Sequence, residues 1–222
     1  MARWAPLRRD VIAATVDEIL GNYRRGRIAI AVDGADGAGK TVFADDLARE
    51  FERRGLAVAR ASIDDFHAPA EQRYRRGRFS AEGCYRDGYQ YDVFRRVLIE
   101  PFRVGGSAAF VTAAFDYRRD TPIEPKWTTG PADLFLIVDG VFLNRPELRG
   151  IWNYSIWLEA DAEVRAERMR VRDGSTPSPE LAARYDGAQE LYERDAKPRQ
   201  AAIAIIDNTD VEHPRRVFAD AC

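Results

Sequence analysis

Residues 34–41 read Gly-Ala-Asp-Gly-Ala-Gly-Lys-Thr and fit the pattern G-x-x-x-x-G-K-[ST] of a phosphate-binding loop. An apolar segment of strand length, residues 27–33, comes directly before this octet, and residues 42–54 carry apolar side chains at helical spacing directly after it. A phosphate-binding loop needs this order of strand, loop and helix. Its glycines let backbone N–H groups turn inward around phosphate oxygens, and the helix N-terminus adds partial positive charge. The octet therefore predicts both a local fold and the binding of a nucleoside triphosphate.

The residues of this loop have different expected contacts. Lys40 would reach the β and γ phosphates, and the Thr41 hydroxyl would bind Mg²⁺. A plain glycine-rich turn would leave the agreement between motif and flanks unexplained. A dinucleotide-binding turn has another glycine spacing and no use for a Lys-Thr pair. The residues expected at the nucleotide are Gly34, Ala35, Asp36, Gly37, Ala38, Gly39, Lys40, Thr41 and Val42.

Length and charge restrict the remaining possibilities. At 222 residues the chain suits one domain over residues 1–222, with room for a small lid. The formal net charge of −2 does not favour a general attraction to nucleic acid or anionic membrane. The sequence shows no transmembrane run and no signal-peptide core, and Cys84 and Cys222 make neither a disulfide framework nor a zinc site. We expect a cytoplasmic protein with a small-molecule substrate and no nucleic-acid or membrane partner.

Strand-like and helix-like segments alternate along the chain. Apolar runs of strand character cover residues 27–33, 56–63, 134–138, 154–159 and 202–207. Helical spacing covers residues 7–23, 42–54, 92–102, 161–172 and 179–194. The run at 134–138 is apolar without alternation, as in a strand buried on both faces of a parallel sheet. The pattern predicts an α/β fold with a doubly wound, mostly parallel sheet, which together with the loop is the P-loop nucleoside triphosphate hydrolase fold.

Three other segments are harder to interpret. Residues 68–92 are rich in Arg, Gly and Tyr without a clean period, which predicts an exposed loop. Residues 108–117 have the β-branched and aromatic content of one strand. Residues 68–92 and 165–178 are candidates for mobile segments that close over the substrate.

Three of the predicted strands end in acids, and ligands of a parallel sheet bind at the carboxyl ends of its strands. Asp139 is typical of the second acidic motif of phosphate-loop proteins, which holds Mg²⁺ directly or through water; the alternative is a carboxylate that caps a turn. Asp64 or its neighbour Asp65 would accept a proton from an attacking hydroxyl, unless both are solvated turn residues. Asp33 is expected to support the loop.

Arginines form a second group of candidates. Arg165, Arg168 and Arg172 lie at i, i+3 and i+7, so one face of the predicted helix carries three guanidinium groups. Such groups stabilise the charge that develops on a phosphoryl group during transfer, although a solvated helix fits the composition equally. The arginines of residues 73–86 are interleaved with aromatic residues, and they either stack on a base or belong to an ordinary solvated loop.

From about residue 27 to residue 208, the sequence resembles the uridine kinase and phosphoribulokinase group, and most closely the uridine kinase-like proteins of bacteria. The resemblance rests on the phosphate loop, on Ser62-Ile63-Asp64-Asp65-Phe66-His67, and on Tyr85-Arg86-Asp87 ahead of Tyr91-Asp92. It implies that Asp64 is the catalytic base, and that residues 165–172 form the lid over the transferring phosphate. The expected catalytic residues are Asp64, Lys40, Arg168 and Arg172, and the expected metal-binding residues are Thr41, Asp64 and Asp139.

The same resemblance implies a set of substrate contacts. Phe115 and Tyr117 belong to a segment that looks like the aromatic hairpin beside the nucleoside base, and Asp87 falls near the acid that binds ribose hydroxyls. The full expected substrate-binding set is Phe66, His67, Tyr85, Asp87, Phe115 and Tyr117. In uridine–cytidine kinases a histidine follows the hairpin, whereas this chain has Arg118-Arg119-Asp120-Thr121 there. The missing histidine affects the expected specificity for a pyrimidine acceptor, but it does not affect the expected kinase chemistry.

These observations lead to one main hypothesis. It is a kinase that uses ATP and Mg²⁺ to phosphorylate the 5′-hydroxyl of uridine or cytidine. The alternative acceptors are pantothenate, a sugar or a phosphosugar. A nucleotide-dependent switch without a small acceptor is less well supported, because the chain has no Asn-Lys-x-Asp element that reads guanine. The resemblance also allows for a homo-oligomer.

Overall fold

A computed structural model describes residues 5–218, and the centre of this part of the chain is a six-stranded sheet. The strands lie in the order β10-β9-β8-β1-β7-β2, and all neighbours pair in parallel except β10 and β9. Their bounds are β1 (Arg27–Gly34), β2 (Val58–Ser62), β7 (Leu134–Gly140), β8 (Tyr154–Glu159), β9 (Ala204–Asp207) and β10 (Arg215–Val217). The predicted α/β fold with a mostly parallel sheet is confirmed, and the antiparallel edge strand β10 was not predicted.

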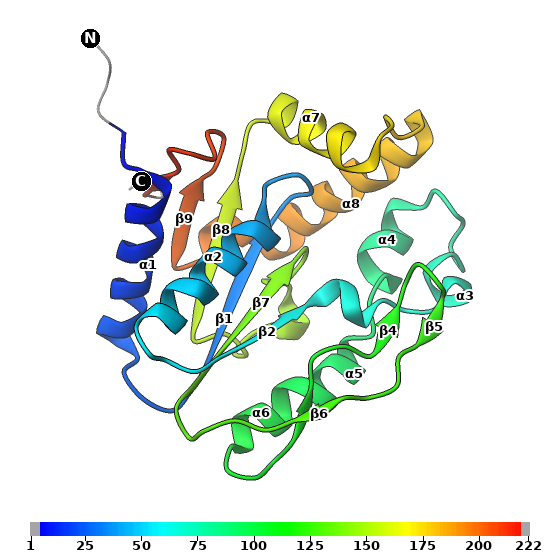
Figure 1. Cartoon of the computed structure of the whole chain (residues 1–222). Helices are drawn as coiled ribbons and strands as arrows, with labels where there is room; N and C mark the ends of the chain where they lie inside the picture. The colour runs from blue at the N-terminus through cyan, green and yellow to red at the C-terminus, as the bar shows by residue number, and fades with distance from the viewer. Residues whose placement is uncertain (1–4, 219–222) are drawn as a thin grey trace.

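Helices cover both faces of this sheet (Figure 1). One face carries α1 (Arg8–Asn22) and α2 (Lys40–Arg53). The other face carries α8 (Pro179–Ala196) and a helical run made of α5 (Tyr91–Phe94), a π-helical turn (Arg95–Ile99) and α6 (Glu100–Val104). The remaining helix of comparable length, α7 (Ala162–Asp173), lies above the carboxyl edge of the sheet (Figure 1).

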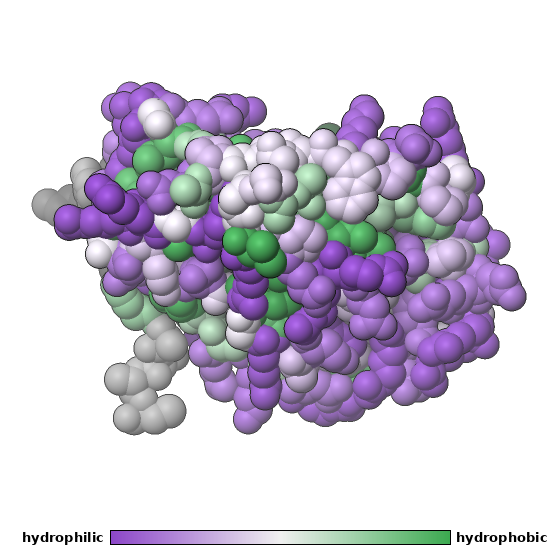
Figure 2. Space-filling model, turned by 90° about the horizontal axis from the view of Figure 1, so that it is seen from below, coloured by the Kyte–Doolittle hydropathy of each residue, from purple (hydrophilic) through white to green (hydrophobic). Residues whose placement is uncertain are grey.

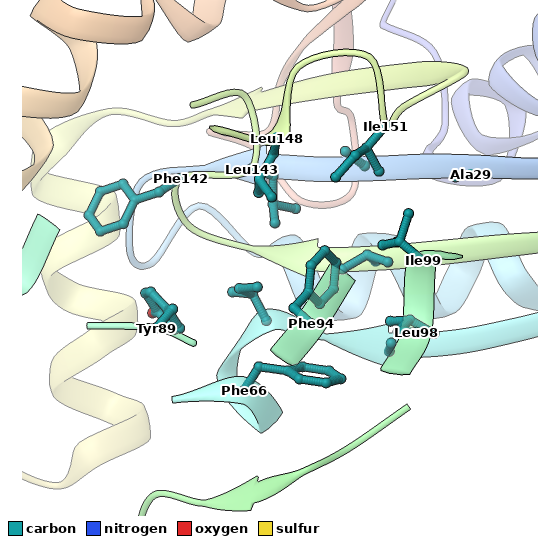
Figure 3. Close-up of a cluster of buried hydrophobic side chains, with 14 of the residues drawn as sticks. Ala29, Phe66, Tyr89, Phe94, Leu98, Ile99, Phe142, Leu143, Leu148 and Ile151 are labelled. Carbon is teal, nitrogen blue, oxygen red and sulfur yellow. The ribbon is translucent and has the colours of Figure 1, made fainter. Parts of the chain in front are cut away.

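A hydrophobic core lies on each face of the sheet, and the side chains of the central strand β1 alternate between these two cores. Ile28 and Ile30 belong to the core under α1 and α2, whereas Ala29 belongs to the core on the opposite face. Successive side chains of a strand point to opposite faces, so an apolar run without alternation supplies both cores. Figure 3 shows part of the second core, where Phe94 and Ile99 of the helical run lie below β1.

The helix after the phosphate loop begins at Lys40, two residues before its predicted start. Gly39 has a φ of 92° and turns the chain directly from the loop into the first helical turn. Glycine adopts such a φ without the steric penalty that a Cβ atom would bring. The first turn of α2 therefore follows directly on the loop, and the N–H groups of a helix start are donors that can bind an anion.

The prediction of an exposed loop over residues 68–92 is correct for residues 74–79 and wrong for most of the rest of the segment. This segment contains α3 (Ala70–Arg73) and α4 (Ala81–Asp87), and α4 packs against α8. Arg184 of α8 is 6% exposed and donates hydrogen bonds to the carbonyls of Arg78 and Ser80, at 2.7 and 3.1 Å. Short helices that are held by such long-range contacts give no long periodic signal in the sequence.

The single strand predicted over residues 108–117 is broken in two. β3 (Phe110–Val111) pairs with β6 (Trp127–Thr128), and β4 (Phe115–Asp116) pairs with β5 (Thr121–Pro122), each pair antiparallel. Between them, the backbone N–H of Ala114 donates to the carbonyl of Asp65 at 2.9 Å. This contact joins the segment to the 3₁₀ turn that follows β2.

Short elements complete the described chain. They are the 3₁₀ turns Ile63–Phe66 and Pro146–Leu148 and the helix α9 (Pro198–Ala201). No helix within residues 5–218 is both long and apolar enough to cross a bilayer. The face at the amino ends of the parallel strands is mostly hydrophilic around a small apolar area (Figure 2).

Candidate functional site

The expected nucleotide residues, 34–42, run from the last residue of β1 through the loop at residues 35–39 into the first turn of α2 (Figure 1). The Lys40 side chain is 10% exposed, and its ammonium group donates to the carbonyl of Ala35 at 2.9 Å. The same ammonium lies 3.9 Å from the Asp36 carboxylate, which is 44% exposed. Lys40 is thus folded back across the turn to which it belongs.

Glycine is required in this turn because other backbone lies close to it. A Cβ atom on Gly34 would lie 2.3 Å from the carbonyl oxygen of Leu158, and one on Gly37 would lie 2.5 Å from that of Arg165. Gly37 also has a φ of 77°. The loop therefore touches the end of β8 on one side and the first turn of α7 on the other.

Gly37→Ala is expected to weaken nucleotide binding at least tenfold, because the new methyl group must push α7 off the loop. Gly55→Ala is the matched control, since Gly55 also has a φ of 77° but a Cβ atom there would meet nothing within 4 Å. The unfavourable φ alone costs about 1–2 kcal/mol, or a fall in Tm of roughly 2–8 °C. Thermal unfolding and MgATP titration of both variants separate the two effects. Equal nucleotide affinity in both variants would contradict the expectation.

Thr41 and Asp139 meet at the base of the loop. The Thr41 hydroxyl donates to Asp139 Oδ2 at 2.6 Å, and the Arg60 guanidinium donates to Asp139 Oδ1 at 2.9 Å. Asp139 is 3% exposed, so Arg60 balances its buried charge. Oxygen ligands of this kind fit Mg²⁺, which binds proteins through one or two side chains and keeps waters and substrate phosphates as its other ligands. The described residues contain no cluster of three or more acidic, His or Cys side chains that would hold a metal by themselves.

Asp33 is a fully buried acid directly below the loop. Its carboxylate accepts hydrogen bonds from the backbone N–H of Gly34 at 2.8 Å, from the side chain of Asn144 at 2.8 Å, and from the Tyr192 hydroxyl. Burial raises the pKa of Asp33, and these hydrogen bonds oppose that rise. The contacts agree with the expected supporting role, but the partners Asn144 and Tyr192 were missed because nothing in their local sequence marks them.

Asp64 and Asp65 lie in the 3₁₀ turn that follows β2, at the same edge of the sheet. In the register of the sheet Ser62 pairs with Asp139, which places the turn beside the Thr41–Asp139 pair. Asp64 is 54% exposed, and its Oδ1 accepts a hydrogen bond from the Tyr89 hydroxyl at 3.1 Å. Asp65 is half-buried, and its pKa is raised by burial and then by the nearby charges of Asp64 and Asp139. Asp64 and Asp65, which follow β2, therefore lie near Asp139 of β7, as expected for acids at the ends of neighbouring parallel strands.

An aromatic group stands next to Asp64. The His67 ring lies between Tyr89 and Tyr117, with centroid distances of 4.5 and 4.9 Å. His67 Nδ1 is 2.8 Å from the carbonyl oxygen of Asp64, and because a carbonyl only accepts, Nδ1 carries the proton. Burial lowers the pKa of His67. His67 and Tyr117 thus belong to one aromatic group beside Asp64, and a contact of either ring with the acceptor stays a prediction.

Four other expected substrate contacts are buried. Phe66 is 0% exposed, Tyr85 and Phe115 are each 2% exposed, and Asp87 is 3% exposed. Asp87 pairs with Arg75 and with Arg76, and the hydrogen bond from Arg75 is the main cause that lowers its pKa. These four side chains are thus buried in this structure, and their contact with an acceptor stays a prediction, because aromatic and acidic residue types do not reveal whether they face a core or a cleft.

The three arginines of α7 differ in the contacts that they make near the phosphate loop. Arg165 donates to the carbonyl of Asp36 at 3.3 Å, and Arg168 donates to those of Asn208 and Thr209 at 2.8 and 2.9 Å. Arg172 instead pairs with Asp173 at 2.7 Å. No residue of α7 is buried, so these polar contacts hold it over the loop. Asn208, whose side chain donates to the Ala38 carbonyl at 2.8 Å, was not predicted as a loop contact.

Comparison with known proteins agrees with this geometry, although no family model matches the chain. A uridine kinase of Leuconostoc citreum (strain KM20) is 25% identical over 147 residues, which are 66% of this chain and 68% of that protein. A uridine kinase of Staphylococcus haemolyticus (strain JCSC1435) is 26% identical over 149 residues, which are 65% of this chain and 67% of that protein.

Solved structures show the same fold. A possible uridine kinase from Bacillus stearothermophilus superposes with a TM-score of 0.70 at 20% identity, over 89% of this chain and 96% of that one. A putative fructose transport system kinase from Silicibacter sp. TM1040 gives 0.63 at 25% identity, over 86% and 94%. A D-glycerate 3-kinase from Cryptococcus neoformans var. grubii gives 0.59 at 12% identity, over 94% and 99%.

Proposed function

We propose that this chain, which is a uridine kinase-like protein with the phosphate-loop kinase fold, transfers the γ-phosphoryl group of ATP to the 5′-hydroxyl of uridine or cytidine. One observation carries the proposal. The exposed carboxylate of Asp64 lies at the edge of the sheet where Lys40 and the Thr41–Asp139 pair meet. A base, a phosphate loop and a metal-binding pair at one edge are the parts that phosphoryl transfer needs.

The proposed reaction uses these residues in fixed roles. Asp64 takes the proton of the acceptor hydroxyl as that oxygen forms a bond to the γ-phosphorus. The bond from the γ-phosphorus to the β–γ bridging oxygen breaks, which releases ADP and leaves the phosphate ester. Lys40, Arg168 and Arg172 stabilise the charge on the phosphoryl oxygens.

Thr41 and Asp139 would hold Mg²⁺, whose charge neutralises the phosphate oxygens when it is bound. Asp64, the third residue of the expected metal set, lies in the turn beside this pair. Arg60 keeps Asp139 in place from the opposite side, because it donates to Asp139 Oδ1 and leaves Oδ2 toward Thr41.

A sugar is the second candidate acceptor. One of the similar structures is a putative fructose transport system kinase, and this chain lacks a histidine at Arg118-Arg119-Asp120-Thr121, directly after the aromatic hairpin. The neutral, hydroxyl-rich surface of a sugar could approach Asp64 past His67 and Tyr117 as a nucleoside would. Pantothenate and phosphosugars remain further alternatives for the same chemistry.

ADP release in the presence of MgATP tests the proposal directly. The panel of acceptors is uridine, cytidine, adenosine, fructose, pantothenate, glycerate and ribulose 5-phosphate, and phosphorus NMR identifies the ester that forms. We expect uridine and cytidine to stimulate release most. If only fructose stimulated ADP release, the proposed acceptor would be a sugar and not a nucleoside. ATP hydrolysis that no acceptor stimulates would refute the kinase proposal.

A further inference from the structure

We propose that Tyr89 is a positioning residue that fixes Asp64 for catalysis. Its hydroxyl donates to Asp64 Oδ1 at 3.1 Å. Within residues 5–218, Asp64 Oδ2 has no hydrogen-bond partner, so Tyr89 holds one carboxylate oxygen and leaves the other toward the acceptor hydroxyl. The inference rests on the proposed function, because it takes Asp64 as the base.

The backbone keeps Tyr89 in register with the turn that carries Asp64. The N–H of Gln90 donates to the carbonyl of Phe66 at 2.8 Å, and the N–H of Ala68 donates to the carbonyl of Gly88 at 2.9 Å. An antiparallel bridge joins His67 to Tyr89 between these two hydrogen bonds. These backbone contacts hold the two segments side by side, which keeps the Tyr89 backbone next to the turn that carries Asp64.

The Tyr89 ring is fixed by packing. The residue is 8% exposed, and its ring centroid lies 4.5 Å from that of His67 and 6.4 Å from that of Phe142, which Figure 3 places in the same apolar cluster. Burial raises the pKa of the Tyr89 phenol well above its ordinary value, so the hydroxyl stays protonated and remains a donor. A hydrogen-bond donor that is itself held by packing restricts the orientation of the carboxylate that it contacts.

The orientation of the Asp64 side chain depends on this hydrogen bond, because little else restricts its rotation. Its side chain is 54% exposed and lies in a short 3₁₀ turn, where a carboxylate can rotate among its rotamers. Proton transfer demands hydrogen-bond distance between the base and the attacking hydroxyl at the moment of attack. The hydrogen bond from Tyr89 restricts this rotation and so raises the fraction of time that Oδ2 is in place.

Tyr89→Phe tests the inference, because it removes only the hydroxyl and keeps the packed ring. We expect kcat to fall roughly 10- to 100-fold with little change in the KM for ATP. Tyr91→Phe is the matched control from the same segment. The Tyr91 ring packs against the Arg145 guanidinium at 4.3 Å and makes no hydrogen bond to Asp64, so this variant should keep its kcat.

The decisive comparison is Tyr89→Phe in an Asp64→Asn background, measured by single-turnover kinetics. If Tyr89 acts through Asp64, the second substitution causes no further loss. An equal loss in both backgrounds, or a normal kcat of Tyr89→Phe while Asp64→Asn is inactive, would overturn the inference and leave the proposed function intact. Near-normal turnover of Asp64→Asn would instead remove the base assignment, and the inference with it.

Discussion

Asp64→Asn is expected to lower kcat by roughly 10²- to 10⁴-fold, the contribution typical of a general base. An amide has nearly the size of the carboxylate and can still accept the hydrogen bond from Tyr89 through its oxygen, but it cannot take the proton of the acceptor hydroxyl. The side chain is 54% exposed, so the fold should tolerate the change. ADP release gives kcat, and calorimetric titration should show that MgATP still binds.

Asp65→Asn is the control for this prediction, because the two acids are adjacent in one turn. Asp65 is half-buried, and burial and neighbouring charges raise its pKa. Its replacement by a neutral amide should cost less activity than the change at Asp64 and should not reduce thermal stability. A larger loss of kcat in Asp65→Asn than in Asp64→Asn would exchange the roles of the two residues.

Lys40→Met is expected to lower kcat by roughly 10²- to 10³-fold, which is the usual cost of removing one preorganised group from the charge of a transition state. The ammonium is 10% exposed and is held across the loop by the Ala35 carbonyl at 2.9 Å. Methionine keeps the length of the side chain without its charge. Steady-state kinetics should show the loss in kcat together with weaker MgATP binding.

Lys126→Met controls for the loss of a lysine as such. Lys126 is exposed and lies in the segment between β5 and β6, and its replacement should leave both kcat and Tm unchanged. Circular dichroism and thermal unfolding of Lys40→Met should show an intact fold. If Lys40→Met retained normal turnover, the loop would not be the site that binds the transferring phosphate.

The phosphate loop shows what local sequence can predict. Residues 27–33 and the octet at 34–41 predicted a strand and a tight turn, and the structure has β1 followed directly by that turn and by α2. Glycines at 34, 37 and 39 all have positive φ values. Backbone freedom and apolar spacing act over a few residues, so they can be seen in a window of the sequence.

The acceptor side shows the limit of such prediction. Tyr85 and Asp87 carry residue types suited to a substrate, yet they are buried where α4 packs against α8 and where Arg75 and Arg76 neutralise Asp87. Tyr89 was not predicted as a site residue, although its hydroxyl contacts Asp64. Burial depends on which distant element covers a segment, and the segment itself does not carry that information.

By itself, the sequence determined the alternation of strands and helices, the loop and the acids at the strand ends. The tertiary structure decided which of these groups meet. Thr41 and Asp139 are 98 residues apart in the chain, Asp33 and Tyr192 are 159 apart, and Tyr89 and Asp64 are 25 apart. Local patterns fix conformation over a turn or a strand, whereas these contacts form only when the parallel sheet and its two cores bring the strand ends together.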